Sequence, residues 1–203
     1  MPTKVSDTFA FACSRSDAWD IIHSDPKADL GISDDARVQA LLAAQEHVAA
    51  SQVELLISTW SAFANHARGL KTKTKTTRFD ALLGRQPDSR TLRGGSWTKT
   101  LVTTRGKELG VGVSIEPTFD GGSYAIYGYI TAPEGYLVQL ESSLTPAPAY
   151  CVRDEAVLYV SEHPLVEGAA FATLAESLVA DAWPVVDQAS RLLSPDRGTK
   201  AKK

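Results

Sequence analysis

The sequence lacks most of the features that mark membrane, exported and cofactor-binding proteins. No apolar run reaches 18 residues, the length that a membrane-spanning helix needs. The N-terminus carries no apolar stretch long enough for a signal peptide. Only two cysteines occur among 203 residues, Cys13 and Cys151. Without an export signal they predict reduced thiols and a cytoplasmic protein with no membrane partner. Abundant alanine and a single methionine are typical of a GC-rich bacterial or phage source.

Motifs of common catalytic and cofactor sites are also missing. The chain contains no GxxxxGK[ST], GxGxxG, GxSxG, HExxH or CxxC sequence. Two of its four histidines, His47 and His66, fall on one predicted helix, where they lie about 28 Å apart and cannot share a metal. We therefore expect a non-enzymatic protein with no catalytic residue, metal or cofactor. The alternative is a metal-dependent hydrolase that uses three acids of the predicted sheet, Glu116, Asp120 and Glu141.

Alternating apolar residues between positions 97 and 162 predict an antiparallel meander of about five to six strands. The clearest alternation is Val111, Val113 and Ile115, and Asp120-Gly121-Gly122 after it is typical of a hairpin turn. Residues 123–131 form the next predicted strand and 136–143 another. A last hairpin is expected around Asp154-Glu155.

Two helices complete the predicted fold. Ser33 is a good N-cap for a helix over residues 33–68, whose wide apolar stripe ends near a terminal glycine. A second helix is predicted over residues 168–193, with a kink or break at Pro184. We predict an α+β domain, 33–193, with both helices on one face of the sheet. The flanking segments are an N-terminal extension, 1–32, with one short helix after a loose start, and a disordered basic tail, 194–203.

The helix over residues 33–68 also bears on the oligomeric state. Leu42, Ala49, Leu56, Phe63 and Leu70 recur at seven-residue spacing, as in helices that pair across a dimer. Packing of this face against the sheet explains the same spacing. A homodimer therefore stays an alternative, and the sequence leaves the oligomeric state open.

Charge is strongly segregated along the chain. Residues 68–107 hold eleven Lys and Arg against two Asp, whereas residues 108–193 carry a net charge of −10. Lys and Arg side chains that neutralise phosphates release the counterions bound to a nucleic acid, which favours binding. This segment therefore predicts an anionic partner, with nucleic acid as the first candidate and an acidic protein as the second. The candidate anion-binding residues lie in the loop-rich part, 69–95: Lys71, Lys73, Lys75, Arg78, Arg85, Arg90 and Arg93. The competing interpretation is a solvated linker, or a segment folded back on the acidic sheet.

Aromatic residues on neighbouring strands suggest a different surface. If the helices cover one face of the sheet, Tyr127 and Tyr129 on the other face are expected to meet solvent. With Trp97 they form a candidate protein-binding surface, because aromatic side chains give large contacts at low entropic cost. The alternative function is thus a protein-binding regulator of the inhibitor or immunity type, which uses either this Tyr-rich face of the sheet or the basic segment. Cross-strand packing of the rings explains the same pattern.

Overall fold

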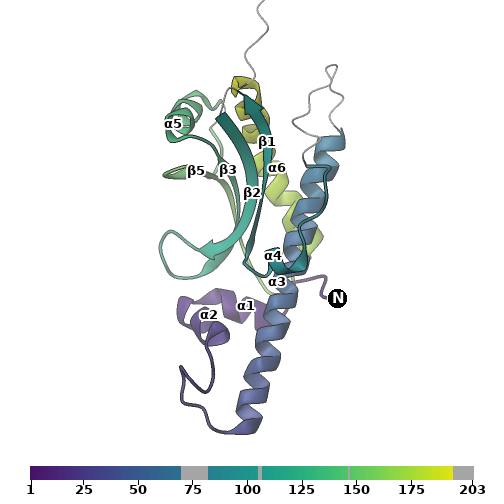
Figure 1. The fold of residues 1–203 in the computed structure, drawn as a ribbon, viewed down its shortest axis with the longest axis vertical. Coiled ribbons are helices and arrows are strands. Elements are labelled where there is room, and N and C mark those ends of the chain that lie inside the picture. The colour runs from purple at the N-terminus through teal and green to yellow at the C-terminus, as the bar shows by residue number, and fades with distance from the viewer. Residues whose placement is uncertain (70–81, 105–106, 146, 194–203) are drawn as a thin grey trace, which may run out of the picture.

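The predicted α+β class is confirmed. A computed structural model describes residues 1–69, 82–104, 107–145 and 147–193. The elements follow in the order α1 (Asp7–Ser14), α2 (Ser16–His23), α3 (Asp35–Gly69), α4 (Ser89–Leu92), β1 (Ser96–Thr104), β2 (Lys107–Pro117), β3 (Tyr124–Thr131), α5 (Glu134–Ser143), β4 (Val152–Asp154), β5 (Val157–Pro164) and α6 (Phe171–Leu193) (Figure 1). None of the described helices is long and apolar enough to cross a bilayer.

The sheet has five antiparallel strands in the order β1-β2-β3-β5-β4. The first three strands form the expected meander. The last two do not continue it, because β5 pairs with β3 and leaves the short β4 at the edge. The predicted hairpin at Asp154-Glu155 is confirmed: Asp154 pairs with Val157, and Glu155 between them takes a positive φ of 45°.

The strand predicted over residues 136–143 is wrong, because these residues belong to helix α5. Tyr136, Leu137 and Leu140 are buried, which is the spacing of one helical face, whereas Val138 is 46% exposed. Pro133 occupies the N-cap position, where its missing N–H costs nothing. The alternation of Tyr136, Val138 and Leu140 therefore does not reflect a strand.

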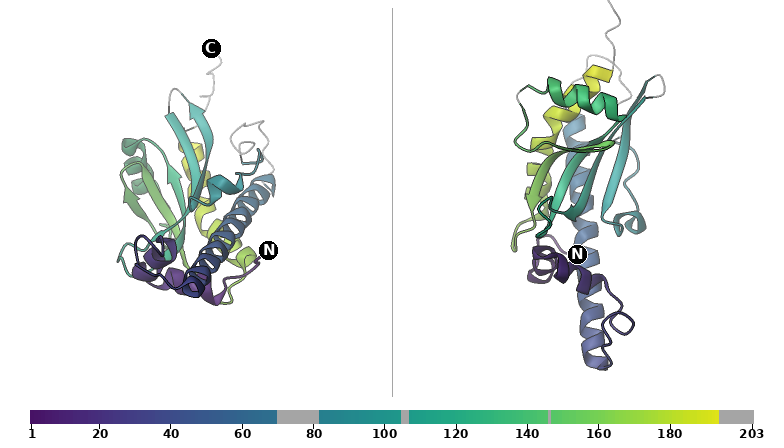
Figure 2. Two further views of the ribbon diagram at one scale, coloured as in Figure 1. Left: turned by 60° about the horizontal axis from the view of Figure 1, so that its bottom comes forward. Right: turned by 90° about the vertical axis from the view of Figure 1, so that its left-hand side faces the viewer.

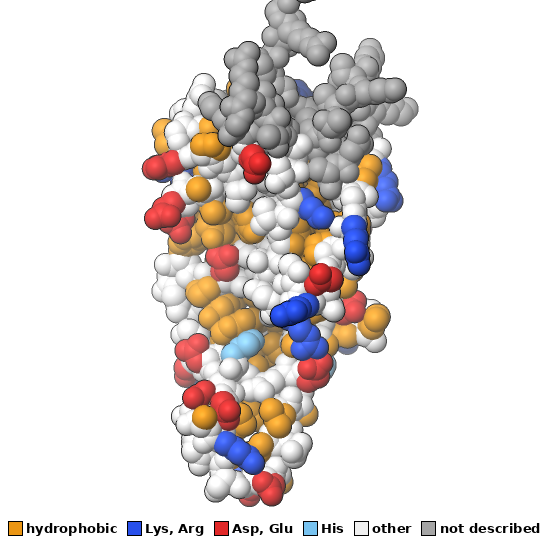
Figure 3. All heavy atoms as spheres, viewed as in Figure 1, with side chains coloured by type: hydrophobic (Ala, Val, Ile, Leu, Met, Phe, Trp, Pro, Cys, Tyr) orange, Lys and Arg blue, Asp and Glu red, His pale blue; other side chains and the backbone are white. Residues whose placement is uncertain are grey.

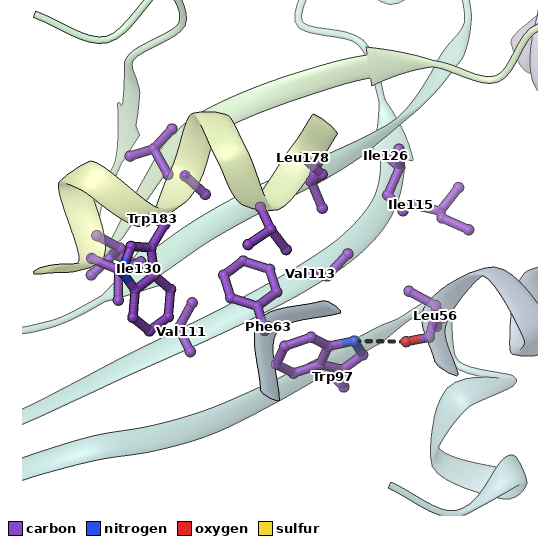
Figure 4. Packing of buried hydrophobic residues seen from close by; sticks show 14 of the residues in the cluster. Leu56, Phe63, Trp97, Val111, Val113, Ile115, Ile126, Ile130, Leu178 and Trp183 are labelled. Carbon is purple, nitrogen blue, oxygen red and sulfur yellow. Dashed lines mark hydrogen bonds between the residues drawn. The ribbon is translucent and has the colours of Figure 1, made fainter. Parts of the chain in front are cut away.

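Helices α3 and α6 pack together over one face of the sheet (Figures 1 and 2). The centre of this core is Phe63 of α3, whose ring meets Trp97 of β1 edge-on at 5.7 Å between centroids and Trp183 of α6 at 6.4 Å (Figure 4). The Trp97 indole donates to the Leu56 carbonyl at 3.1 Å, so its one polar group is satisfied inside the core. One face of the sheet is thereby closed to solvent.

Helix α6 runs through Pro184 as one helix, which excludes the break but not the kink that the sequence predicted as its alternative. Proline removes the N–H that would bond the carbonyl of Ala180, four residues earlier. Ala180 and Pro184 both face solvent, where water can satisfy the free carbonyl.

The expected loose start is also wrong, because the first residues pair with the segment before α6. The Val5 amide donates to the Ala169 carbonyl at 2.8 Å, and the Gly168 amide donates back to Val5. Ser6 then caps α1 by accepting from the Phe9 amide, and Phe9 is fully buried against Phe171. This contact places α1 and α2 beside α3, which extends past the end of the sheet (Figure 1).

Candidate functional site

The described part of the basic segment is a loop and a short helix pinned to the core at two points. Leu82 and Leu92 are fully buried, and Asp88 between them begins α4 by accepting from the Thr91 amide at 2.8 Å. This hydrogen bond, helped by the nearby Arg85, lowers the pKa of the Asp88 carboxyl. Arg85, Arg90 and Arg93 lie exposed along this stretch. The other candidates, Lys71, Lys73, Lys75 and Arg78, fall outside the described residues.

A cavity of about 320 Å³ lies between this loop and β1. Arg85 and Lys99 both line it, and the Lys99 ammonium donates to the Arg85 carbonyl at 2.9 Å, which ties the loop to the strand. Gln86, Thr91 and Thr98 add further hydrogen-bond donors around the opening. Asp88 also lines the cavity, but part of its carboxylate is already used to cap α4. The lining is therefore rich in groups that bind an anion.

Arg93 lies away from this cavity. Its guanidinium pairs with Glu46 of α3 at 2.8 Å and borders a separate, larger cavity of about 750 Å³ between α3 and residues 22–27. The pair lowers the pKa of Glu46. Arg90 lines neither cavity. The three described arginines thus follow one edge of the molecule without converging on one point.

The described bases of this segment remain largely uncompensated. Among the described residues, Arg93 is the one basic residue of the segment that forms an ion pair. Its partner, Glu46, lies in α3 and not in the sheet. On the face that Figure 3 shows, Lys and Arg gather on the side of β1 and α4, and Asp and Glu predominate on the opposite side. The described bases therefore do not fold back on the acidic strands.

The second face of the sheet carries a separate aromatic cluster. Tyr127, Tyr129 and Tyr159 pack ring against ring at 5.4–5.9 Å, and Phe119 of the β2–β3 loop lies over them. The expectation that Tyr127 and Tyr129 face solvent is wrong, because the neighbouring rings bury both, and Trp97 is buried in the core. These three side chains accordingly offer a partner almost no surface.

Polar groups hold this cluster in place. The Tyr159 hydroxyl donates to Glu116 at 2.7 Å, and the Tyr129 hydroxyl lies 2.6 Å from that of Thr98. Gly112 is required beneath Tyr129, since an added Cβ would stand 2.4 Å from its ring. Burial, together with Glu116, raises the pKa of Tyr159 far above its ordinary range.

All six tyrosines of the folded protein should titrate above the ordinary tyrosine pKa of about 10. Burial raises the pKa of each, to about 12 for Tyr136. Unfolded tyrosine has a pKa near 10, so the unfolded chain releases protons first and the free energy of unfolding falls as pH rises above about 10. Tyrosinate absorbance should appear together with loss of circular dichroism. A gradual rise centred at pH 10 in folded protein would contradict this packing.

The three acids of the hydrolase hypothesis are held by different partners. Glu116 accepts from Tyr159, Asp120 accepts from Thr118 and the Gly122 amide within its own loop, and Glu141 of α5 pairs with Arg153. Within the described ranges, no group of three His, Cys, Asp or Glu side chains is placed to hold a metal ion. The geometry does not bring these acids together.

Two residues of the aromatic cluster were not predicted from the sequence: Phe119 and Tyr159. A signal for Tyr159 was present, because it alternates with Val157 on β5 and so shares a face with the other tyrosines. No sequence signal indicated Phe119, since a position in a loop does not predict the direction of the side chain. Comparisons of the chain with known protein families, curated proteins and solved structures found no match.

Proposed function

We propose that this protein is a non-enzymatic intracellular binding protein whose basic segment, residues 68–107, contacts an anionic partner, with nucleic acid as the first candidate. The observation that carries the proposal is the exposed Arg85 and Arg90, which pair with no acid among the described residues. The free thiols of Cys13 and Cys151 fit a reducing cytoplasm.

Phosphate groups suit this edge better than a single small anion would. Arg85, Arg90 and Lys99 are spread along a loop, a helix and a strand, with one donor-lined cavity among them. Spread charges can follow a phosphate backbone, and such contacts position a nucleic acid without reading its sequence. We therefore propose binding that depends strongly on salt and weakly on sequence.

A salt series with oligonucleotides tests this function. Contacts from Lys71, Lys73, Lys75, Arg78 and Arg85 to five phosphates should give a slope of roughly −3.5 to −4.5 in log K against log salt. Changing Lys71, Lys73 and Lys75 together to Ala should flatten the slope by roughly two to three. Gel shifts at several salt concentrations measure both slopes.

Melting curves of the same two proteins serve as the control. On this proposal the three lysines contact the partner and not the folded domain, so the triple variant should melt as the wild type does. No shift at low salt with any single- or double-stranded DNA or RNA would contradict the nucleic-acid proposal. An acidic protein would then be the partner to seek, by a pull-down that survives nuclease treatment.

A further inference from the structure

A third cavity, which differs from the basic segment in charge and composition, lies at one end of the aromatic face. It has a volume of about 420 Å³ and is formed by the β2–β3 loop, the start of β3 and the end of β5. Its walls carry three aromatic rings, Phe119, Tyr124 and Tyr150, and two carboxylates, Asp120 and Glu162. The loop projects from the end of the sheet nearest α1 and α2 (Figure 1).

Other aromatic rings pack against the aromatic walls of the cavity. Tyr124 stacks on Trp19 of α2 with 4.2 Å between ring centroids, and Trp19 in turn stacks on His23. Phe119 meets Tyr127 at 6.0 Å and Tyr150 at 6.5 Å, yet it stays 56% exposed. An exposed aromatic ring above a buried cluster leaves apolar surface that a ligand can cover.

The polar side chains that line the cavity all carry oxygen atoms. Asp120 already accepts from Thr118 and the Gly122 amide, whereas the Tyr150 hydroxyl is shielded from solvent and has no hydrogen-bond partner in the described chain. Glu162 lines the same cavity. Burial, together with Glu162, raises the pKa of Tyr150, so this carboxylate lies close to the Tyr150 hydroxyl.

Charge decides which ligand fits. Among the described residues that line the cavity, none is Lys, Arg or His, and Asp120 and Glu162 would repel an anion. Aromatic faces attract cations, and carboxylate and hydroxyl oxygens accept the N–H bonds of an ammonium group.

We infer that this cavity binds a primary alkylammonium group, with Glu162 and the Tyr150 hydroxyl accepting its hydrogen bonds and the rings of Phe119, Tyr124 and Tyr150 enclosing its alkyl stem. The group can come from a small free amine or from a lysine side chain of a polypeptide, since both present the same chemistry. None of the residues that line this cavity belongs to the basic segment, so the inference is independent of nucleic-acid binding.

Chemical-shift mapping by ¹H–¹⁵N NMR tests the inference, with n-butylammonium chloride and the peptide Gly-Gly-Lys-Gly-Gly as probes. Saturable shifts are expected in residues 118–125 and 150–152. Tighter binding of butylammonium assigns the site to free amines, whereas tighter binding of the peptide assigns it to a polypeptide lysine. The same shifts with sodium chloride alone, or no saturable shift with either probe, would overturn the proposal.

Two variants locate the binding groups. Glu162→Gln keeps the shape of the side chain but removes its charge, and should weaken binding about tenfold or more. Glu167→Gln, an exposed change of equal charge outside the cavity, should bind as the wild type does. Phe119→Ala should also weaken binding, and a melting curve of this variant separates that effect from lost packing against Tyr127 and Tyr159. Unchanged binding by both Glu162→Gln and Phe119→Ala, or equal binding of tetramethylammonium, which has no N–H, would refute these hydrogen-bonding roles.

Discussion

Phe63→Ala is expected to lower the free energy of unfolding by about 3–5 kcal/mol, a large part of the 5–15 kcal/mol typical of a domain. The ring is fully buried between Trp97 of β1 and Trp183 of α6. Its loss leaves a cavity where α3, α6 and the sheet meet, and two large indoles cannot easily close it. Urea unfolding monitored by circular dichroism measures the change.

Leu42→Ala provides the matched control. Leu42 lies on the same helix and in the same seven-residue series as Phe63, but it is in the first half of α3 and is 43% exposed. Its truncation should cost less than about 1 kcal/mol. Equal effects of the two changes would show that the centre of the core lies elsewhere.

Charge reversal at the basic edge should have the second large effect. The double change Arg85→Glu and Arg90→Glu replaces two exposed basic side chains by acidic ones, and neither arginine forms an ion pair among the described residues. If each lost phosphate contact weakens binding about tenfold, oligonucleotide affinity at low salt should fall roughly 100-fold. Fluorescence anisotropy with a labelled oligonucleotide measures it.

The control for this reversal changes net charge by the same amount at another place. Lys27→Glu with Arg37→Glu alters two exposed bases, one in the loop before α3 and one in its first turns. A global charge effect would weaken binding equally in both double variants. The proposal requires the Arg85 and Arg90 pair to matter far more.

Most of the fold could be predicted from the periodicity of apolar residues and from composition. The alternation of Val111, Val113 and Ile115 has one cause, a sheet with one buried face, and the 33–68 stripe is too long for anything but a helix. Residues 134–143 show the limit, because ten residues satisfy a strand and a helix pattern equally well. The position of β5 between β3 and β4 could not be predicted either, since pairing between strands that are distant in sequence leaves no local sequence pattern.

The two candidate sites differed in how far the sequence predicts them. Segregated charge is a property of composition, so the basic edge could be predicted, and Arg85 and Lys99 do line one cavity. The direction of the tyrosines could be predicted too, because alternation placed Tyr127 and Tyr129 on one face. Their burial could not, since it depends on Phe119 and Tyr159 folding over them from a loop and a distant strand.

Photocrosslinking followed by peptide mapping tests the central claim most directly. The wild-type protein is irradiated at low salt with a single-stranded oligonucleotide that carries photoreactive bases, and the crosslinked peptides are identified by mass spectrometry. We predict crosslinks within residues 68–107, including the stretch 85–99, and their loss in the Arg85→Glu, Arg90→Glu variant. Crosslinks confined to residues 108–193, or none at all, would contradict the account.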